Sequence, residues 1–170
     1  EVEHPGTFSL RTLEFLRHAS REEAALIEKL APYVIKNCVV RPDSSTDQIG
    51  DLSLAEFLLL QDLGILSGVE ALGMTNVIGT TTVGKFTCVL MSYGRGLLVS
   101  HEDAGKKLEL PVYLVTRLGQ EVLRLGWKRA DETYLRLVGN FIKQKEFDVQ
   151  IGDCENVEGG MIRCNNMVPI

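Results

Sequence analysis

The pattern with the clearest chemical meaning is Gly79-Thr-Thr-Thr-Val-Gly84-Lys85, which fits the G-x-x-x-x-G-K signature of a phosphate-binding loop. Such a loop requires Ser or Thr at the next position, to reach Mg²⁺, and then a helix whose N-terminus faces the phosphates. Phe86 occupies that position here, and the residues after it are typical of a strand. The sequence therefore predicts a β-turn between two strands and no nucleotide site.

Two further groups of side chains have the chemistry of metal ligands but not the spacing. His101-Glu-Asp103 lacks the second histidine that a zinc-binding helical pair requires, so we interpret it as a solvated loop after a strand. Cys154 and Cys164 have neither a C-x-x-C pair nor a nearby histidine. Small apolar or exposed thiols are the favoured interpretation there, and a metal site or disulfide is the minor alternative.

An acidic segment without Lys or Arg lies near the end of the chain, at Glu146, Asp148, Asp153, Glu155 and Glu158. Its spacing differs from that of a calcium loop, so we interpret it as solvated, with attraction of a basic partner as the minor alternative. No G-x-S-x-G elbow is present, and the histidines lie beside no obvious nucleophile. The sequence assigns no catalytic, cofactor-binding or metal-binding residue and disfavours an enzyme.

Composition limits the classes of partner. The chain has 170 residues and a net charge of −5, which disfavours a general binder of nucleic acid or anionic membrane, since both need a positive field. No apolar run is long enough to span a bilayer, and no signal peptide opens the chain. Four scattered cysteines indicate a reduced, cytoplasmic compartment. Because the chain starts at Glu1, we expect a domain cut from a longer protein.

The most strongly bounded element is the helix expected within residues 51–68. Ser53 and Glu56 form an S-x-x-E capping box, and Gly64 stands where a left-handed C-cap is favoured. Apolar residues, including Phe57, lie around most of its circumference. A helix of this kind needs cover on most sides, so we expect it to be mostly buried at the centre of the fold.

Other elements follow from caps, periodicity and turns. Helices are expected after Ser9, after a second capping box at Ser20, between Thr116 and Gly126, and after Asp131. Strands are expected near residues 38–41, 75–82, 85–93, 96–101, 108–116 and 147–151. Pro111 predicts that the strand containing it is an edge strand or carries a bulge. We expect residues 1–145 to form one domain, with 146–170 as a C-terminal strand and tail packed on it or partly flexible.

Residues 50–126 resemble winged-helix domains. The resemblance rests on a capped helix ending in Leu-Gly-Ile-Leu, the β-hairpins after it, and the segment Tyr113-Leu-Val-Thr-Arg-Leu-Gly119. Val115 is an extra residue relative to the tighter version of that motif, and the β region is longer than one wing. The resemblance implies an α+β, winged-helix-like fold with helices packed on a small antiparallel sheet of three to five strands.

The N-terminal segment Glu3-His-Pro-Gly-Thr-Phe-Ser-Leu-Arg-Thr-Leu-Glu-Phe-Leu16 resembles a bacterial family of unknown function. Its members carry a Pro-Gly-[Ser/Thr]-Phe-Ser-x-Arg-Thr segment after a helix rich in Trp and Leu. The likeness runs through Leu60 and more weakly to residue 140. It implies a further N-terminal region in the natural protein, but no activity and no site residues.

Three classes of function remain. The favoured one is a protein-interaction or regulatory module, with the edge near Pro111 or the Leu54, Phe57 and Leu58 face available for a protein partner or self-association. The alternative is a winged-helix DNA binder, disfavoured because its reading helix would be the acidic 51–63 segment, which has no Lys or Arg. An enzyme with a dispersed site is the second alternative. The remaining cations are interpreted as solvated surface: Arg11, Arg17, Arg21, Lys106, Lys107, Lys128 and Arg129.

Overall fold

A computed structural model describes residues 8–42, 48–70, 74–80, 82–126, 129–157 and 159–170. Its helices are α1 (Leu10–His18), α2 (Arg21–Leu30), α3 (Leu54–Asp62), α4 (Arg117–Leu123) and α5 (Glu132–Lys143), with a 3₁₀ turn at Ala31–Tyr33. Its strands are β1 (Cys38–Val40), β2 (Gln48–Ile49), β3 (Leu52–Ser53), β4 (Leu66–Ser67), β5 (Thr75–Ile78), β6 (Phe86–Ser92), β7 (Arg95–His101), β8 (Leu108–Val115), β9 (Asp148–Val157) and β10 (Met161–Pro169). The expected α+β class is confirmed.

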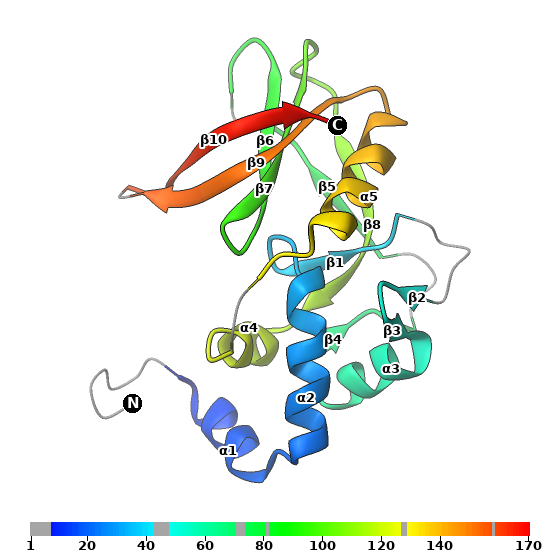
Figure 1. Cartoon of the computed structure of the whole chain (residues 1–170), viewed down its shortest axis with the longest axis vertical. Coiled ribbons are helices and arrows are strands. Elements are labelled where there is room, and N and C mark those ends of the chain that lie inside the picture. The colour runs from blue at the N-terminus through cyan, green and yellow to red at the C-terminus, as the bar shows by residue number, and fades with distance from the viewer. Residues whose placement is uncertain (1–7, 43–47, 71–73, 81, 127–128, 158) are drawn as a thin grey trace.

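The described elements form two halves. Helices α1 to α4 lie in the lower half of Figure 1, and strands β6, β7, β9 and β10 lie in the upper half with α5 beside them. Two four-stranded antiparallel sheets are present, together with the short β2–β3 pair. The β structure is therefore larger than the small sheet of three to five strands that the sequence predicted, because the last two strands form a long hairpin.

The helices begin where the capping residues in the sequence predicted. The Ser20 hydroxyl accepts the Glu23 N–H at 3.1 Å while the Glu23 carboxylate accepts the Ser20 N–H at 2.7 Å, so the predicted capping box is confirmed. A second capping box begins α3 at Ser53 and Glu56. Single caps begin α1 and α5. These local hydrogen bonds satisfy backbone donors that have no partner within the helix.

Strand β8 lies in the middle of the first sheet, between β1 on one side and β4 and β5 on the other. The prediction that Pro111 marks an edge strand or a bulge is therefore wrong, since the strand has neighbours on both sides and its pairing with β1 and β5 shows no register shift. The Pro111 carbonyl accepts the Arg41 N–H at 2.8 Å just past the end of β1, so the proline nitrogen faces that same side. Because Pro111 has no N–H, the ladder between β1 and β8 loses at most its last hydrogen bond.

The second sheet has the order β10-β9-β7-β6. The sequence predicted one short strand near residues 147–151 and then a tail; instead β9 extends to Val157 and the tail forms β10, which pairs with it. The pairing shifts register between Asn165 and Val168, where Asn166 adopts a left-handed φ of 52°. Helix α5 packs against β9 and β7 and covers the inner face of this sheet.

The two sheets share one continuous hydrophobic core. Tyr134 of α5 is fully buried against β1, and its hydroxyl donates to the Val40 carbonyl at 2.7 Å. The backbone N–H of Lys36 donates to the Met91 carbonyl on β6 at 2.9 Å. These two hydrogen bonds join the halves of the molecule. Because hydrogen bonds are directional, they fix how the halves are aligned, which apolar packing alone would not do.

Helix α3 is not the centre of the fold, which corrects the expectation of a mostly buried helix. Phe57 and Leu60 are buried, and the Phe57 ring packs 5.1 Å from the ring of Tyr113 on β8. Leu54 and Leu58 are half-buried, however, and Leu59 is 54% exposed. One face of this short helix packs on the sheet while the opposite face meets solvent, even though both faces are apolar.

Helix α4 comes close to the backbone of Ile65 at Gly119, and this contact fixes the position of the helix. A Cβ on Gly119 would overlap the carbonyl oxygen of Ile65 and come within 2.9 Å of the Val115 side chain. We expect Gly119→Ala to lower the free energy of unfolding by about 1–3 kcal/mol, because a backbone oxygen cannot move aside cheaply. Gly139→Ala in α5 is the matched control, since its Cβ would meet mainly the flexible tip of Ile170. Urea denaturation that finds both variants equally destabilised would contradict this account.

Candidate functional site

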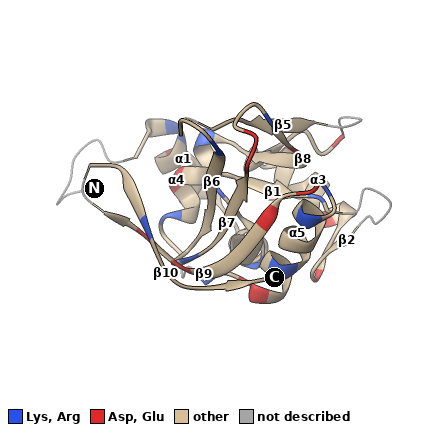
Figure 2. Ribbon diagram, turned by 90° about the horizontal axis from the view of Figure 1, so that it is seen from above, with Lys and Arg blue, Asp and Glu red and all other residues tan. Residues whose placement is uncertain are grey.

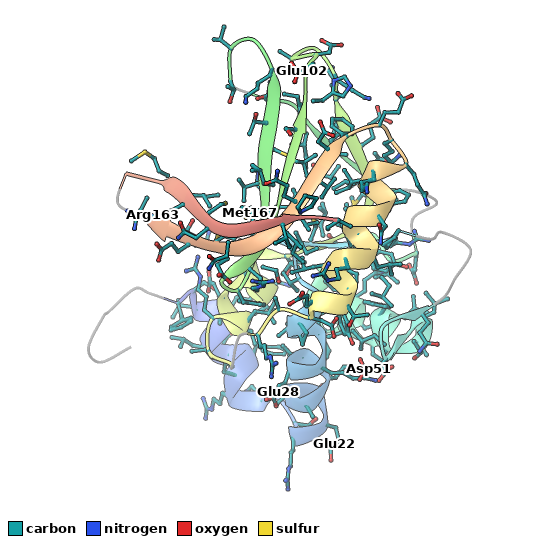
Figure 3. The ribbon with its side chains drawn as sticks, turned by 45° about the horizontal axis from the view of Figure 1, so that its top comes forward. Glu22, Glu28, Asp51, Glu102, Arg163 and Met167 are labelled. Atoms are coloured by element: carbon teal, nitrogen blue, oxygen red, sulfur yellow. The ribbon has the colours of Figure 1, made fainter. Side chains whose placement is uncertain are left out.

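An apolar groove of about 350 Å³ opens between α1, α2 and α4. We call it the helix groove and define it by Phe15, Leu16, Ala19, Ile27, Leu123 and Leu125. Glu28 is the one ionisable residue among those that line it. It lies on the exposed side of α2, where Figure 3 labels it. A hollow with this lining can bind apolar side chains, but it offers little polar chemistry to a reacting group.

The groove is open because of how α1 and α2 are joined. Ala19 ends α1 in an extended conformation, and Ser20 already caps α2, so no loop lies between the two helices. Small residues at Ala24 of α2, at Ala31 of the 3₁₀ turn after it and at Gly126 leave the floor of the groove hollow. The sequence predicted both caps, but the angle between the helices depends on contacts with α4.

Glu121 of α4 holds α1 in place. One carboxylate oxygen accepts the backbone N–H of Ser9 at 2.8 Å and the hydroxyl of Thr12 at 2.7 Å. The other accepts from the Arg117 guanidinium at 3.1 Å. The Thr12 hydroxyl and the Ser9 N–H lower the pKa of Glu121 to about 2, and the negative charge also lies at the N-terminus of α1, where the helix dipole favours it. No local sequence signal indicated this role for Glu121.

Helix α1 buries one side chain, the polar Thr12. Its leucines are not covered in the same way: Leu10 is 80% exposed and Leu16 stands at the groove rim. Leu125, on the opposite side of the groove, is 53% exposed. Exposed apolar residues that gather around one hollow are typical of an interaction surface.

Residues of opposite charge are mixed over the described part of the chain, so charge does not mark one face as a binding surface. Figure 2 shows Lys and Arg interspersed with Asp and Glu over the described ribbon. Lys106 was interpreted as solvated, but its ammonium lies 4.6 Å from the centre of the Phe147 ring and 3.5 Å from Glu146. Lys128 lies outside the described residues. The remaining candidate cations are exposed, as expected: Arg11, Arg17, Arg21, Lys107 and Arg129.

The phosphate-loop pattern leads into a strand, as predicted. Lys85 is exposed and β6 begins at the next residue, so the element that follows the loop is a strand and not a helix. Thr81, within the pattern, lies outside the described residues. His101 is the last residue of β7, and Glu102 and Asp103 begin the loop after it, where the Asp103 N–H donates to the His101 imidazole at 3.0 Å. Neither pattern contributes to the helix groove.

The C-terminal acidic residues are not a free solvated segment. Asp153 pairs with Arg95 at 2.6 Å, and Glu155 pairs with Arg163 of the neighbouring strand at 3.2 Å. Glu158 lies outside the described residues. The sequence could not show the Glu155–Arg163 pair because it did not indicate β10, the strand that carries Arg163. The Asp153–Arg95 pair depends on the register between β7 and β9. The stretch therefore offers less free negative charge to a basic partner than its composition suggested.

Cys154 and Cys164 lie directly opposite each other on β9 and β10, with their sulfur atoms 2.9 Å apart. Both are free thiols, as the sequence favoured, but the sequence did not indicate that they are neighbours. Within the described ranges, no three His, Cys, Asp or Glu side chains gather as a metal site. None of the helices in those ranges has the length and hydrophobicity that a membrane crossing requires.

Comparisons with known proteins add no assignment. No family model matches the chain, and neither the curated proteins nor the solved structures include a significant match. The two resemblances noted from the sequence therefore stay predictions. The helix groove is the feature of the described residues that carries most information about function.

The role of Glu121 as an anchor predicts how the stability of the fold depends on pH. The pKa of Glu121 lies near 2 in the folded chain, below its ordinary value of 4.5, so its ionised form stabilises the fold above pH 4.5. This contribution is lost as the pH falls from 4.5 towards 2. We expect Glu121→Gln to lower the melting temperature at neutral pH, by an amount that shrinks across that range. Thermal denaturation followed by circular dichroism measures both effects.

The control is Glu14→Gln, which removes an exposed carboxylate from α1 itself. It should leave the melting temperature and its pH dependence nearly unchanged, because surface charges contribute little to stability. A Glu121→Gln variant with the acid dependence of the wild type would refute the anchoring role.

Proposed function

We propose that the protein is a protein-interaction or regulatory module whose helix groove binds the same groove of a second copy of the chain. The observation that carries the proposal is that two exposed leucines, Leu16 and Leu125, stand on opposite sides of an apolar hollow. Association would remove this apolar surface from water, which is the main favourable term in most protein–protein contacts.

The shape and chemistry of the groove favour a protein as the occupant. It is apolar along its length, and Glu28 alone could orient a small polar ligand. Binding sites for small molecules normally combine an apolar lining with several convergent polar groups. A row of apolar side chains from a helix needs no such groups, and it matches a groove bounded by helices.

An apolar surface of this kind can pack against a copy of itself, which favours a second copy of the chain as the partner. Leu16 stands on one side of the groove and Leu125 on the other. A two-fold axis through the groove would set these leucines of each copy against the groove of its partner, since such an interface repeats every contact twice.

The winged-helix-like arrangement of residues 50–126 belongs to this proposal as a rigid platform for the groove. Support comes from the chain order, in which α3 is followed by β strands and then by α4. The platform is not proposed to read DNA. Glu56 of α3 binds the Lys29 ammonium at 2.6 Å, so the nearest cation is already paired with a carboxylate. Asp62 adds a further negative charge to α3.

Sedimentation equilibrium tests the proposed dimer. We expect the wild-type chain to associate reversibly and Leu125→Asp to weaken association by roughly tenfold or more, because removing a buried leucine from an interface costs about 1.5–3 kcal/mol. Leu137→Asp is the matched control, since Leu137 is likewise 53% exposed but lies on α5, away from the groove. A wild-type chain that stays monomeric at the highest soluble concentration would overturn the proposal.

Binding to DNA is tested separately by fluorescence anisotropy with a labelled duplex. We expect no binding at low salt, the condition that most favours contacts between cations and phosphates. Salt-dependent binding at submicromolar protein would instead revive the DNA alternative.

A further inference from the structure

Cys154 and Cys164 occupy the position in an antiparallel ladder where side chains approach most closely. The backbone N–H of Cys154 donates to the Gly94 carbonyl at 3.0 Å, on the side away from β10. Cys154 and Cys164 therefore form a non-hydrogen-bonded pair of the β9–β10 ladder, for which Cα atoms are about 4.5 Å apart. That separation lies within the range that a disulfide spans.

The surroundings of the two sulfurs differ. Cys154 is 2% exposed and lies over Gly96, where a Cβ would come within 2.8 Å of its sulfur. Cys164 is half-buried, so a reagent in solution reaches its sulfur first. Burial, with a contribution from the Cys164 thiol, raises the pKa of Cys154 to about 12. The buried sulfur thus stays protonated until its neighbour has reacted.

The pair lies at the base of a projecting ribbon. Strand β7 pairs with β9 only as far as Asp153, so residues 155–157 pair with β10 alone. This ribbon extends past the β6–β7 turn in Figure 1, and Figure 3 labels Arg163 on its β10 strand. A two-stranded ribbon is marginally stable by itself, and Arg163 and Glu155 add an exposed ion pair across it.

The ribbon forms one wall of a cleft of about 430 Å³. Asn156 and Ile162 line the cleft from the ribbon, and Val89 and Met91 line it from the edge strand β6. The position of the ribbon therefore sets the width of the cleft. A covalent bond at the base of the ribbon would restrict that position.

We propose that Cys154 and Cys164 form a reversible disulfide that fixes the β9–β10 ribbon over this cleft. The oxidant is a small disulfide such as glutathione disulfide. The Cys164 thiolate attacks one of its sulfurs, which forms a mixed disulfide and releases one glutathione. Cys154 then gives up its proton and attacks the Cys164 sulfur, which releases the second glutathione. Two thiols lose two protons and two electrons, and one glutathione disulfide becomes two thiols.

Mass spectrometry of the native chain tests the bond. The protein is equilibrated in buffers of increasing glutathione disulfide, quenched in acid, alkylated and digested. We expect a Cys154–Cys164 linked peptide that disappears on addition of dithiothreitol. Cys154→Ser and Cys164→Ser should each abolish it, and Cys88→Ser, at a half-buried cysteine elsewhere on β6, should leave it unchanged. A lasting glutathione adduct on Cys164, or links between chains only, would overturn the proposal.

Hydrogen exchange tests the restraint on the ribbon. Oxidation should slow amide exchange in residues 155–157 and 161–163 by roughly tenfold or more, because a closed short loop limits local opening. Exchange in α2, which is remote from the ribbon, should not change. A disulfide that forms without slowing exchange in the ribbon would show that the bond exists but restrains nothing, and would refute the proposed effect on the cleft.

Discussion

Strand β8 imposes the constraint on which the rest of the structure depends. It is hydrogen-bonded on both sides from Pro111 to Val115, and Leu108, Leu110 and Val112 on it are almost completely buried. Because its neighbours come from β1, β4 and β5, three distant segments have their register set by one strand. Helix α4 begins two residues after β8 ends, so its position is fixed by the same ladder. The shape of the helix groove depends on this position, since α4 forms one of its walls.

The groove illustrates how an apolar surface can stay uncovered in a folded chain. Helix α1 is held by charge-assisted hydrogen bonds that Ser9 and Thr12 donate to the Glu121 carboxylate, and not by burial of its leucines. Hydrogen bonds to an ionised carboxylate are stronger than neutral ones and strongly directional. A helix anchored in this way can present Leu16 at the groove to a partner without loss of its own position.

Local signals in the sequence predicted the elements better than their arrangement. Capping boxes at Ser20 and Ser53 placed two helix starts, since their hydrogen bonds close within one turn. The C-terminal strand was missed because residues 161–169 contain few β-branched residues and pair only with β9. The Glu121–Thr12 bond joins residues 109 positions apart, which no local pattern encodes. The groove, which depends on it, could not be foreseen either.

The irregular pairing at Asn165 and Asn166 has a consequence for solubility. Strand β10 closes the second sheet, and a regular outer strand would offer an unbroken row of amide donors and acceptors to another molecule. The register shift interrupts that row, Arg163 places a charge on it, and Pro169 removes a donor near its end. Edge-to-edge pairing of sheets into filaments is thereby discouraged, although the strand is exposed along most of its length.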